Sequence, residues 1–401
     1  MKSLNIIIIA AVDLPEGGGE TTRLKTLAGA IKSAGHKVQI LLENTSGNID
    51  DAMLQPRGSF DGVPFRYILG DVKPLTGLRF FTGKYKAVSN LVSEIKQLHS
   101  REKVDVIWIN QLAFHTIYPL TQLARKLGIK VIHSYEDERI KGNGLKRKLI
   151  YYNQLLADKY MSPKADAIVV ISHYLKEKYE KLSDGKVPVH IIPTIVNIKN
   201  WQVGAEPDND IPLLLYYGSF YGFDEIELLM DAVKLLKDNG KNVKIYLVGH
   251  NRKNPAYMQS LADRANELGL NENVIFKGFT KHDKLREYIA EANVLIGLRK
   301  DDEWSRTGLS TKLSEYLSTG RLVICTAIGD NTKYLEDKKS ALLMKPGCSA
   351  RELAETIQLA VDDDILRKQI GNEGFKVAKE NFDAEAVKNK INQLLEKAIR
   401  R

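Results

Sequence analysis

Short apolar runs alternate with segments of helical periodicity along almost the whole chain. The first run covers residues 4–12, and it is followed by a glycine-rich loop and by a segment whose apolar residues recur every three or four positions. A continuous apolar run of this kind is typical of a strand that is buried on both faces of a parallel sheet. The alternation therefore predicts an α/β protein with helices packed on parallel sheets. Residues 44–85 show neither pattern, so we expect them to be irregular.

The chain is long enough for two such domains. Its 401 residues exceed what one hydrophobic core ordinarily supports. Residues 203–212 are rich in Pro, Gly and Asp and have no periodicity, which favours a linker there. We expect residues 1–198 to form a first Rossmann-like domain and 199–380 a second one, with 381–401 a terminal helix that packs back on the first domain. A ligand is expected in the cleft at the carboxyl ends of the strands.

The positive charge is concentrated in the first half of the sequence. Residues 1–200 hold 29 Lys and Arg against 19 Asp and Glu, whereas the rest of the chain is nearly balanced. Such an excess suits an anionic membrane surface, a phosphorylated substrate or a nucleic acid, although it also serves solubility. No recognition helix or stacking-strand motif is present, so nucleic acid is the poorest fit of the three.

Cysteine usage and the N-terminal run both favour the cytoplasm. Cys325 and Cys348 are the only cysteines, too few for a disulfide framework or a thiolate metal site. The apolar run 4–12 is far shorter than a membrane span, and no small-residue cleavage pattern follows it. Acidic clusters at 301–303 and 362–364 are explained more simply by helix starts and solvation than by a metal ion.

Residues 304–326 read as a loop, a short helix, a tight turn and a buried strand. Ser310 or Thr311 can cap the helix, whose first N–H groups lack partners within the helix. Arg306 and Lys312 add positive charge there, and Glu315 lies three residues beyond Lys312. The pattern is typical of a site for a ligand that carries both phosphate and sugar hydroxyls. An ordinary amphipathic helix with a Lys312–Glu315 ion pair fits the same residues.

Several short motifs follow one another along nearly the whole chain. They are Gly17-Gly-Gly-Glu20, Gly35-His-Lys-Val38, Ile192-Pro-Thr-Ile-Val-Asn197, Tyr217-Gly-Ser219, Tyr246-Leu-Val-Gly249, Val274-Ile-Phe-Lys-Gly-Phe279 and Thr311-Lys-Leu-Ser-Glu-Tyr-Leu-Ser-Thr-Gly320. In this order and spacing they resemble the GT-B glycosyltransferases, and most closely family 4, the retaining nucleotide-sugar enzymes. The resemblance implies two Rossmann-like domains that face each other across a cleft, the first acceptor-binding and the second donor-binding. It implies a nucleoside diphosphate-sugar as donor and no resident cofactor or metal.

The resemblance also implies roles for individual residues. Glu315 matches the second glutamate of the family's Glu-x7-Glu motif and is expected to bind the ribose hydroxyls, whereas the first position of that motif is Thr307. The segment that reads the nucleobase through its backbone matches Gly278-Phe279. The glycine loop would let backbone approach the donor diphosphate and sugar, because glycine has no Cβ. The donor-binding residues expected on this basis are Gly17, Gly18, Gly19, Gly218, Ser219, Gly249, Phe279, Arg299, Arg306, Gly308, Leu309, Lys312 and Glu315.

One departure from the family concerns the phosphate clamp. Many members hold the diphosphate with an Arg and a Lys, where this chain has Ser219 and Asp224. The negative charge of Asp224 cannot hold phosphate, so the cation is expected from Arg299, Arg306 or Lys312. A solvated surface side chain is the alternative reading of Arg299.

A second departure concerns the residue that contacts the transferred sugar. The family strand ends in His-Asp, whereas alignment by the strand end places Glu136 and Asp137 there. Glu136 could accept hydrogen bonds from sugar hydroxyls or stabilise positive charge at the anomeric carbon, so both are catalytic candidates. Residues 136–138 could instead form a merely solvated acidic turn. His133 points to the same side as Tyr135 and is predicted to be a structural strand residue.

The family's acceptors are often lipid-linked. Residues 73–86 and 139–148 interleave basic with aromatic or apolar residues, which suits an anionic bilayer or an undecaprenyl-diphosphate acceptor. We therefore expect a role in surface polysaccharide biosynthesis and peripheral association with the inner face of the membrane. Two rival functions remain, a nucleotide-sugar epimerase that needs no acceptor and a transferase-like subunit without catalysis.

Overall fold

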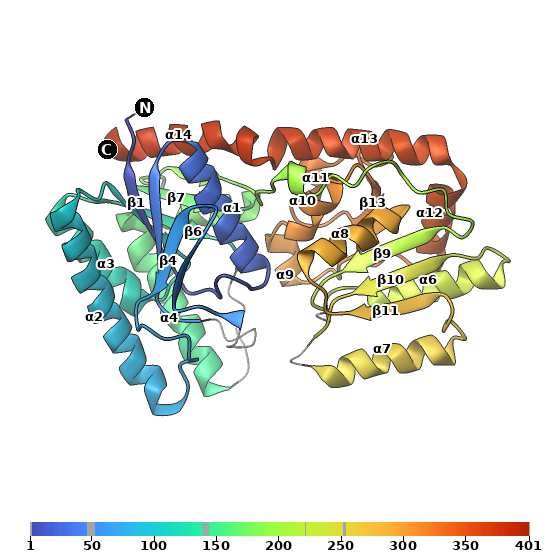
Figure 1. Ribbon diagram of the computed structural model, residues 1–401, viewed down its shortest axis with the longest axis horizontal. Helices are drawn as coiled ribbons and strands as arrows, with labels where there is room; N and C mark the ends of the chain where they lie inside the picture. The colour runs from blue at the N-terminus through green and yellow to red at the C-terminus, as the bar shows by residue number, and fades with distance from the viewer. Residues whose placement is uncertain (1, 46–52, 139–143, 221, 252–253, 401) are drawn as a thin grey trace. The chain divides into compact units, whose positions relative to one another are not determined.

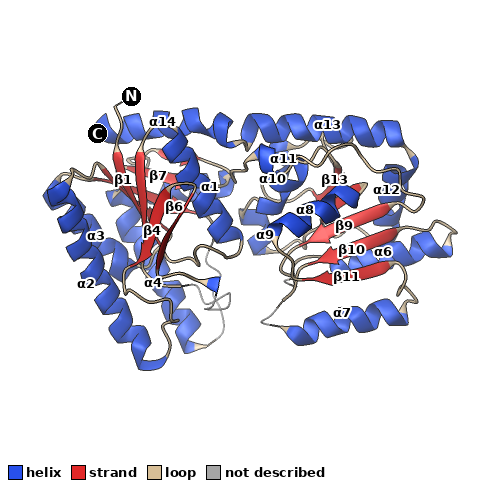
Figure 2. Ribbon diagram, viewed as in Figure 1, coloured by secondary structure: helices blue, strands red, loops and turns tan. Residues whose placement is uncertain are grey.

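The computed structural model describes residues 2–400 except 46–52, 139–143, 221 and 252–253. The chain forms two compact units. Unit 1 comprises Met1–Ile195 and Ala384–Arg401, and unit 2 comprises Val196–Asp383. Each unit is a largely parallel sheet with helices packed on both faces (Figures 1 and 2). The α/β class with two Rossmann-like units, predicted from the alternating pattern, is therefore confirmed.

Unit 1 has an eight-stranded sheet in the order β3-β4-β2-β1-β5-β6-β7-β8. All neighbours pair in parallel except β3 and β4, which form an antiparallel edge. The strands are β1 (Asn5–Ala10), β2 (Lys37–Leu42), β3 (Arg57–Phe60), β4 (Val63–Tyr67), β5 (Val106–Asn110), β6 (Lys130–Tyr135), β7 (Ala167–Val170) and β8 (Val189–Ile191).

Both faces of this sheet are covered, which explains why β1 is apolar without interruption. Ile6 and Ile8 belong to a core under α1 and α14, whereas Ile7 and Ile9 belong to a core under α2, α3 and α4. Alternate side chains of a strand point to opposite faces, so a strand covered on both sides needs apolar residues throughout. The helices are α1 (Gly19–Ser33), α2 (Gly77–Arg101), α3 (Phe114–Leu127), α4 (Leu145–Met161), α5 (His173–Leu182) and α14 (Ala384–Arg400).

The prediction that residues 44–85 are irregular is wrong. This stretch contains β3 and β4, and α2 begins within it at Gly77. Both strands are short, and β3 is an edge strand, where one-sided burial and tolerance of Gly and Pro weaken the sequence signal. Tyr67 ties β4 to the end of β1, since its hydroxyl accepts a hydrogen bond from Leu14 N at 2.8 Å and donates one to Val12 O at 3.1 Å.

Unit 2 has a six-stranded parallel sheet in the order β11-β10-β9-β12-β13-β14. Its strands are β9 (Leu213–Tyr217), β10 (Lys244–Val248), β11 (Val274–Gly278), β12 (Val294–Gly297), β13 (Leu322–Thr326) and β14 (Leu342–Met344). Its helices are α6 (Ile226–Asp238), α7 (Pro255–Glu267), α8 (His282–Glu291), α9 (Glu303–Thr307), α10 (Thr311–Leu317), α11 (Asn331–Tyr334), α12 (Ala350–Asp362) and α13 (Asp364–Asn381).

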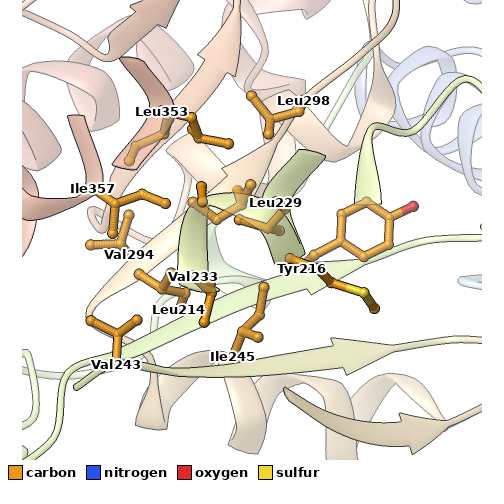
Figure 3. Close-up of a cluster of buried hydrophobic side chains, with 14 of the residues drawn as sticks. Leu214, Tyr216, Leu229, Val233, Val243, Ile245, Val294, Leu298, Leu353 and Ile357 are labelled. Carbon is orange, nitrogen blue, oxygen red and sulfur yellow. The ribbon is translucent and has the colours of Figure 1, made fainter. Parts of the chain in front are cut away.

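The larger core of unit 2 lies between the sheet and the helices α6 and α12. Figure 3 shows Leu214 and Ile245 from the strands facing Val233 of α6, with Leu353 and Ile357 supplied by α12. A second core lies on the other face, where α8, α10 and α13 pack. The sheet is thus held rigidly from both sides, which positions the loops at its carboxyl edge.

The segment 203–212 does not link the units. It lies within unit 2, and the chain passes between the units at Ile195–Val196 and again at Asp383–Ala384. Glu206 forms a buried ion pair with Arg367 of α13, and Arg321 donates hydrogen bonds to Gly204 O at 3.3 Å and Ala205 O at 2.9 Å. The prediction of a linker is wrong. The Pro, Gly and Asp residues of this segment prevent a helix or strand, but they do not prevent Arg321 and Arg367 from binding it to the rest of unit 2.

Among the described residues, no helix is both long enough and apolar enough to cross a bilayer.

Candidate functional site

The residues predicted to bind the donor in unit 2 gather at one edge of its sheet. The strands β9 to β13 are parallel, so their carboxyl ends meet at a common edge. Gly218 follows β9, Gly249 follows β10, Arg299 lies just past β12, and α10 runs back from the same edge. Phe279 directly follows β11 and is more than half exposed.

Two loops at this edge approach each other so closely that only glycine fits. Gly249 has a φ of +123°, and a Cβ there would lie 1.9 Å from the carbonyl oxygen of Gly218. Gly249 N donates to Gly278 O at 2.8 Å, which joins the loops after β10 and β11. A pocket of about 400 Å³ opens beside these glycines and is lined by Met258 and Phe276 among others.

Lys312 is held in a buried ion pair with Asp224. Its Nζ lies 2.8 Å from Asp224 Oδ1, donates to Tyr216 OH at 3.3 Å and sits 4.5 Å from the centre of the Tyr216 ring. Burial lowers the pKa of Lys312, with Asp224 opposing that shift and Arg299 adding to it. The predicted alternative, an ion pair of Lys312 with Glu315, is wrong, because Lys312 turns to the loop after β9 instead.

Glu315 is a buried carboxylate without a counter-charge. It lies on α10, and no hydrogen bond or ion pair to its side chain is found in the described part of the chain. Burial alone raises its pKa from 4.5 to about 8. Ser310, one of the two residues predicted to cap α10, occupies the N-cap position, but its side chain makes no capping hydrogen bond.

The remaining two candidate cations differ in their surroundings. The Arg299 guanidinium lies 4.6 Å from the centre of the Phe223 ring and 3.4 Å from Ser310 Oγ, so it is not a solvated surface side chain. Its Nε is buried and has no hydrogen-bond acceptor among the described residues. Arg306 is exposed and pairs with Asp301 at 2.6 Å.

In the glycine loop of unit 1, the fold itself requires glycine at position 17, whether or not a ligand binds there. A Cβ on Gly17 would lie 2.0 Å from Thr21 Oγ1, because the loop closes onto the first turn of α1. Thr21 Oγ1 in turn donates to Asp13 O at 2.6 Å. Gly18 is the N-cap residue of α1, where a Cβ would meet open space, and Gly19 begins the helix.

Glu136 is buried at the end of β6 and paired with a cation that the sequence analysis missed. Arg23 Nε lies 2.9 Å from Glu136 Oε1, and the same guanidinium donates to Ile192 O and Pro193 O. Burial raises the pKa of Glu136 to about 7, although Arg23 opposes this shift. Glu138 pairs with Lys178 at 2.7 Å, so the alternative of a solvated acidic turn is wrong.

The turn after β6 is held by Gln111, which the sequence analysis also missed. Gln111 Oε1 accepts hydrogen bonds from the backbone N–H groups of Glu136 and Asp137, and its Nε2 donates to Asp137 O at 2.9 Å. Gln111 adopts a φ of +45°, which is uncommon for a residue with a side chain. His133 is buried in the sheet, where desolvation lowers its pKa to about 4.

Two family models match the sequence, and together they span most of both units. The model described as Glycosyltransferase Family 4 matches residues 17–200, and the one described as Glycosyl transferases group 1 matches residues 197–377. The chain is a GT-B glycosyltransferase resembling family 4. Its curated relative, an uncharacterized glycosyltransferase YqgM of Bacillus subtilis (strain 168), is 22% identical over 263 residues, which are 65% of this chain and 68% of that protein.

Solved glycosyltransferase structures share the fold over the full length. A sucrose-phosphate synthase from Thermosynechococcus elongatus has a TM-score of 0.75 at 20% identity, with 99% of each chain covered. HepE of Anabaena in complex with UDP-glucose has a TM-score of 0.70 at 16% identity, covering 98% of this chain and 99% of that one.

The acidic clusters of this glycosyltransferase serve its helix starts. Asp302 accepts a hydrogen bond from Ser305 N at 2.7 Å and caps α9, and Asp363 caps α13 by accepting from Leu366 N at 2.8 Å. Within the described ranges, no group of three or more His, Cys, Asp or Glu side chains is placed to hold a metal ion.

Of the two residues that the sequence analysis missed, Arg23 carries a signal in the glycosyltransferase sequence and Gln111 does not. Arg23 lies among the apolar positions of α1, next to Leu24 and one turn before Leu27, and a charged residue on a buried helix face signals a specific partner. Gln111 carries no comparable signal, because its role depends on a positive φ and on a turn that follows a different strand.

Proposed function

We propose that this glycosyltransferase moves a sugar, with retention, from a nucleoside diphosphate-sugar to a glycan or lipid-linked acceptor, without a metal ion or another cofactor. The observation that carries the proposal is the unpartnered Glu315 carboxylate at the carboxyl edge of the unit 2 sheet. A buried polar group without a partner costs free energy, and two ribose hydroxyls are suitable donors to it. The UDP-glucose complex of HepE supports a donor of this class.

The diphosphate would be held by Arg299 and Lys312. Arg299 has a buried Nε with no acceptor, and its guanidinium presents donors in a planar fork that suits phosphate oxygens. An ammonium group has three N–H donors, of which Lys312 uses one on Asp224 and one on Tyr216, so one is left for a ligand. Gly218, Ser219, Gly249 and Phe279 would contribute backbone contacts, and Arg306 the least, because it is solvent-exposed and already paired.

Unit 1 would bind the acceptor and the transferred sugar. We assign Glu136 and Asp137 to the sugar pocket, with Arg23 holding the Glu136 carboxylate in place and Gln111 holding the turn. A carboxylate near an anomeric carbon would stabilise positive charge that develops there, to the extent that the Arg23 charge leaves it net negative. We further propose a role in surface polysaccharide synthesis at an anionic membrane face.

The donor assignment can be tested with a panel of UDP-, GDP-, ADP- and dTDP-sugars. A true donor raises the thermal midpoint, because it binds only the folded state. We expect Glu315→Gln to weaken binding of that donor by about tenfold or more, since one ribose hydroxyl would face an amide N–H2 group instead of an acceptor oxygen. Glu355→Gln, on the exposed face of α12, is the matched control and should bind normally. Equal donor affinity in both variants would remove Glu315 from the site.

Product analysis separates the proposed reaction from its rivals. Conversion of the donor sugar to another sugar nucleotide in the absence of acceptor would indicate an epimerase, whereas binding without any turnover would indicate a non-catalytic subunit. A transferase forms a glycosidic bond only when acceptor is present. The anomeric configuration of that bond, measured by NMR, then tests retention.

A further inference from the structure

Helix α4 of unit 1 carries a concentration of exposed apolar side chains. Six of its large apolar residues have exposed fractions between 37% and 57%. These residues are Leu149, Ile150, Tyr152, Leu155, Leu156 and Tyr160. Single exposed apolar residues are normal on a protein surface, but six on one helix form a patch that needs an explanation. We call these six residues, with the exposed Lys148 and Lys159, the α4 surface.

The exposed apolar residues follow helical spacing on the solvent side. Leu149, Tyr152, Leu156 and Tyr160 are separated by three, four and four positions, so they form one row along the helix. The opposite side of α4 is buried, with Ala157 and Met161 in the core of unit 1. The row is therefore not a core-facing stripe, which would account for such spacing in an ordinary amphipathic helix.

The charges around the row are positive. Lys148 and Lys159 are exposed, and Lys159 Nζ lies 5.4 Å from the Tyr160 ring centre. The one acidic residue in the sequence of α4, Asp158, is buried and paired with Lys178 at 3.0 Å. Tyr118 of α3, the helix that packs on α4, is exposed as well, and Lys164 Nζ lies 6.0 Å from the centre of its ring.

The two other basic segments of unit 1, residues 73–86 and 139–148, present fewer unpaired cations among the described residues than their sequence suggests. In the segment 73–86, Arg79 pairs with Asp71 at 2.6 Å and Lys84 with the buried Glu43 at 3.0 Å, so two of its cations are already neutralised. Residues 139–143 of the second predicted segment lie outside the described residues. Helix α2 also carries an exposed aromatic side chain beside an exposed cation, Tyr85 next to Lys86. Among the described side chains of unit 1, however, α4 is the helix on which several large apolar residues are exposed together.

An anionic lipid bilayer matches this chemistry better than a protein surface does. A helix in the plane of the interface buries leucines among the upper acyl chains, keeps lysines at the headgroups and places tyrosines between them. Anionic headgroups attract exposed lysines, and no exposed acidic side chain of α4 opposes that attraction. A purely apolar protein interface would gain nothing from the lysines beside the row.

We propose that the α4 surface binds the surface of an anionic lipid bilayer. In a parallel α/β unit the helix that follows a strand starts at the carboxyl edge of the sheet, and α4 follows β6, whose end carries Glu136. Leu149 lies about one turn from the helix start, so the bilayer contact begins close to that edge. The choice of a lipid-linked acceptor rests on the proposed function, whereas the bilayer contact itself rests on α4 alone.

Flotation with vesicles tests this proposal. The full chain is mixed with phosphatidylcholine vesicles, with and without phosphatidylglycerol, and the bound fraction is measured at low and high salt. We expect binding that needs phosphatidylglycerol and weakens with salt, and Tyr152→Ser/Leu156→Ser should lower the partition coefficient by about tenfold or more. The matched control Leu359→Ser/Ile365→Ser removes two exposed apolar side chains from unit 2 and should bind as the wild type does.

Other outcomes overturn the proposal. Equal binding by the α4 variant and the control, or binding that is indifferent to phosphatidylglycerol and salt, would place the contact elsewhere. A wild-type dimer that becomes monomeric in the α4 variant, without vesicle binding by either, would make the α4 surface a contact between copies. Circular dichroism and the donor-induced thermal shift should be unchanged in the α4 variant, which excludes misfolding. Vesicle binding by a chain that binds no sugar nucleotide would contradict the proposed function and leave this inference standing.

Discussion

Two buried carboxylates, Glu315 in unit 2 and Glu136 in unit 1, dominate the chemistry at the residue scale. Burial raises the pKa of both, to about 8 for Glu315 and about 7 for Glu136. They differ in their partners, since Arg23 lies beside Glu136, whereas among the described residues no charged group offsets the burial of Glu315. A buried carboxylate without a partner, such as Glu315, is a candidate for binding a ligand, whereas the ion pair of Glu136 with Arg23 also has a structural role.

The pKa of Glu315 predicts a pH-dependent stability. Between pH 4.5 and about pH 8, Glu315 is protonated in the folded chain and ionised in the unfolded chain. The free energy of unfolding therefore falls as the pH rises through this window. Glu315→Gln removes this loss. We expect the variant to gain stability over the wild type by on the order of a few kcal/mol between about pH 5 and about pH 8.5, measured by urea unfolding. Parallel curves for wild type and variant would show that Glu315 is ionised in the folded protein.

Gly249 predicts a steric requirement at the same edge. Gly249→Ala would place a Cβ 1.9 Å from Gly218 O at a φ of +123°, so the two loops must separate. We expect a loss of roughly 2–4 kcal/mol in unfolding free energy and at least about tenfold weaker donor binding, measured by denaturation and calorimetry. Gly222→Ala, where a Cβ meets open space, should change neither quantity. A stable, donor-binding Gly249→Ala protein would contradict the close approach.

At the scale of elements, α10 and the loop after β9 are joined through Lys312 and Asp224. The pair is buried, with side-chain exposures of 13% and 2%. The hydroxyl of Tyr316, also on α10, accepts a hydrogen bond from Tyr217 N, at the end of β9, at 2.9 Å. Glu315 and Lys312, the ribose-binding candidate and one of the two phosphate-binding candidates, therefore lie on one short helix, which is anchored to β9 and the loop after it.

Replacing one partner of the Lys312–Asp224 pair should lower the free energy of unfolding more than replacing both partners. Lys312→Met leaves Asp224 buried and unpaired, so we expect a loss of about 3–5 kcal/mol in unfolding free energy, and a smaller loss for Asp224→Leu/Lys312→Met. Both variants should bind donor more weakly than the wild type. The nearby exposed pair is the control, since Arg306→Met should leave stability unchanged. Equal losses in the single and double variants would mean that the two charges are not coupled.

The boundaries of elements were harder to predict than their order. Strong local periodicity located most strands and helices, including β1 and α14, because both faces of β1 and one face of α14 are apolar in the sequence itself. The strands β3 and β4 gave little signal, since both are short and β3 lies at the edge of the sheet, where its residues are only partly buried. The segment 203–212 resembled a linker because its anchors, Arg321 and Arg367, come from elsewhere in the chain.

In the molecule as a whole, α14 belongs to unit 1, although all of unit 2 precedes it in the sequence. Helix α14 packs against α1 and adds Val387, Ile391 and Leu394 to the core on one face of the unit 1 sheet. The chain therefore crosses between the units twice, and the stability of unit 1 depends on residues that follow unit 2 in the sequence.

This arrangement predicts an effect confined to unit 1. Leu394→Ala removes a fully buried side chain, so we expect it to lower the unfolding free energy of unit 1 by about 2–5 kcal/mol while leaving the donor-induced stabilisation of unit 2 intact. Scanning calorimetry with and without donor separates the two effects. Ile399→Ala, at an exposed position on the same helix, should change little. A smaller donor-induced shift in Leu394→Ala would contradict the division into units.

The α/β class, the order of most elements and the family resemblance could be predicted from the amino-acid sequence, because periodicity and motif spacing are properties of neighbouring residues. The pairing of the charges at the candidate site depends on the three-dimensional fold. Arg23 reaches Glu136, and Lys312 pairs with Asp224, so that no described residue pairs with Glu315. These pairings depend on which distant segments the fold brings within about 4 Å, and on burial that no local pattern specifies.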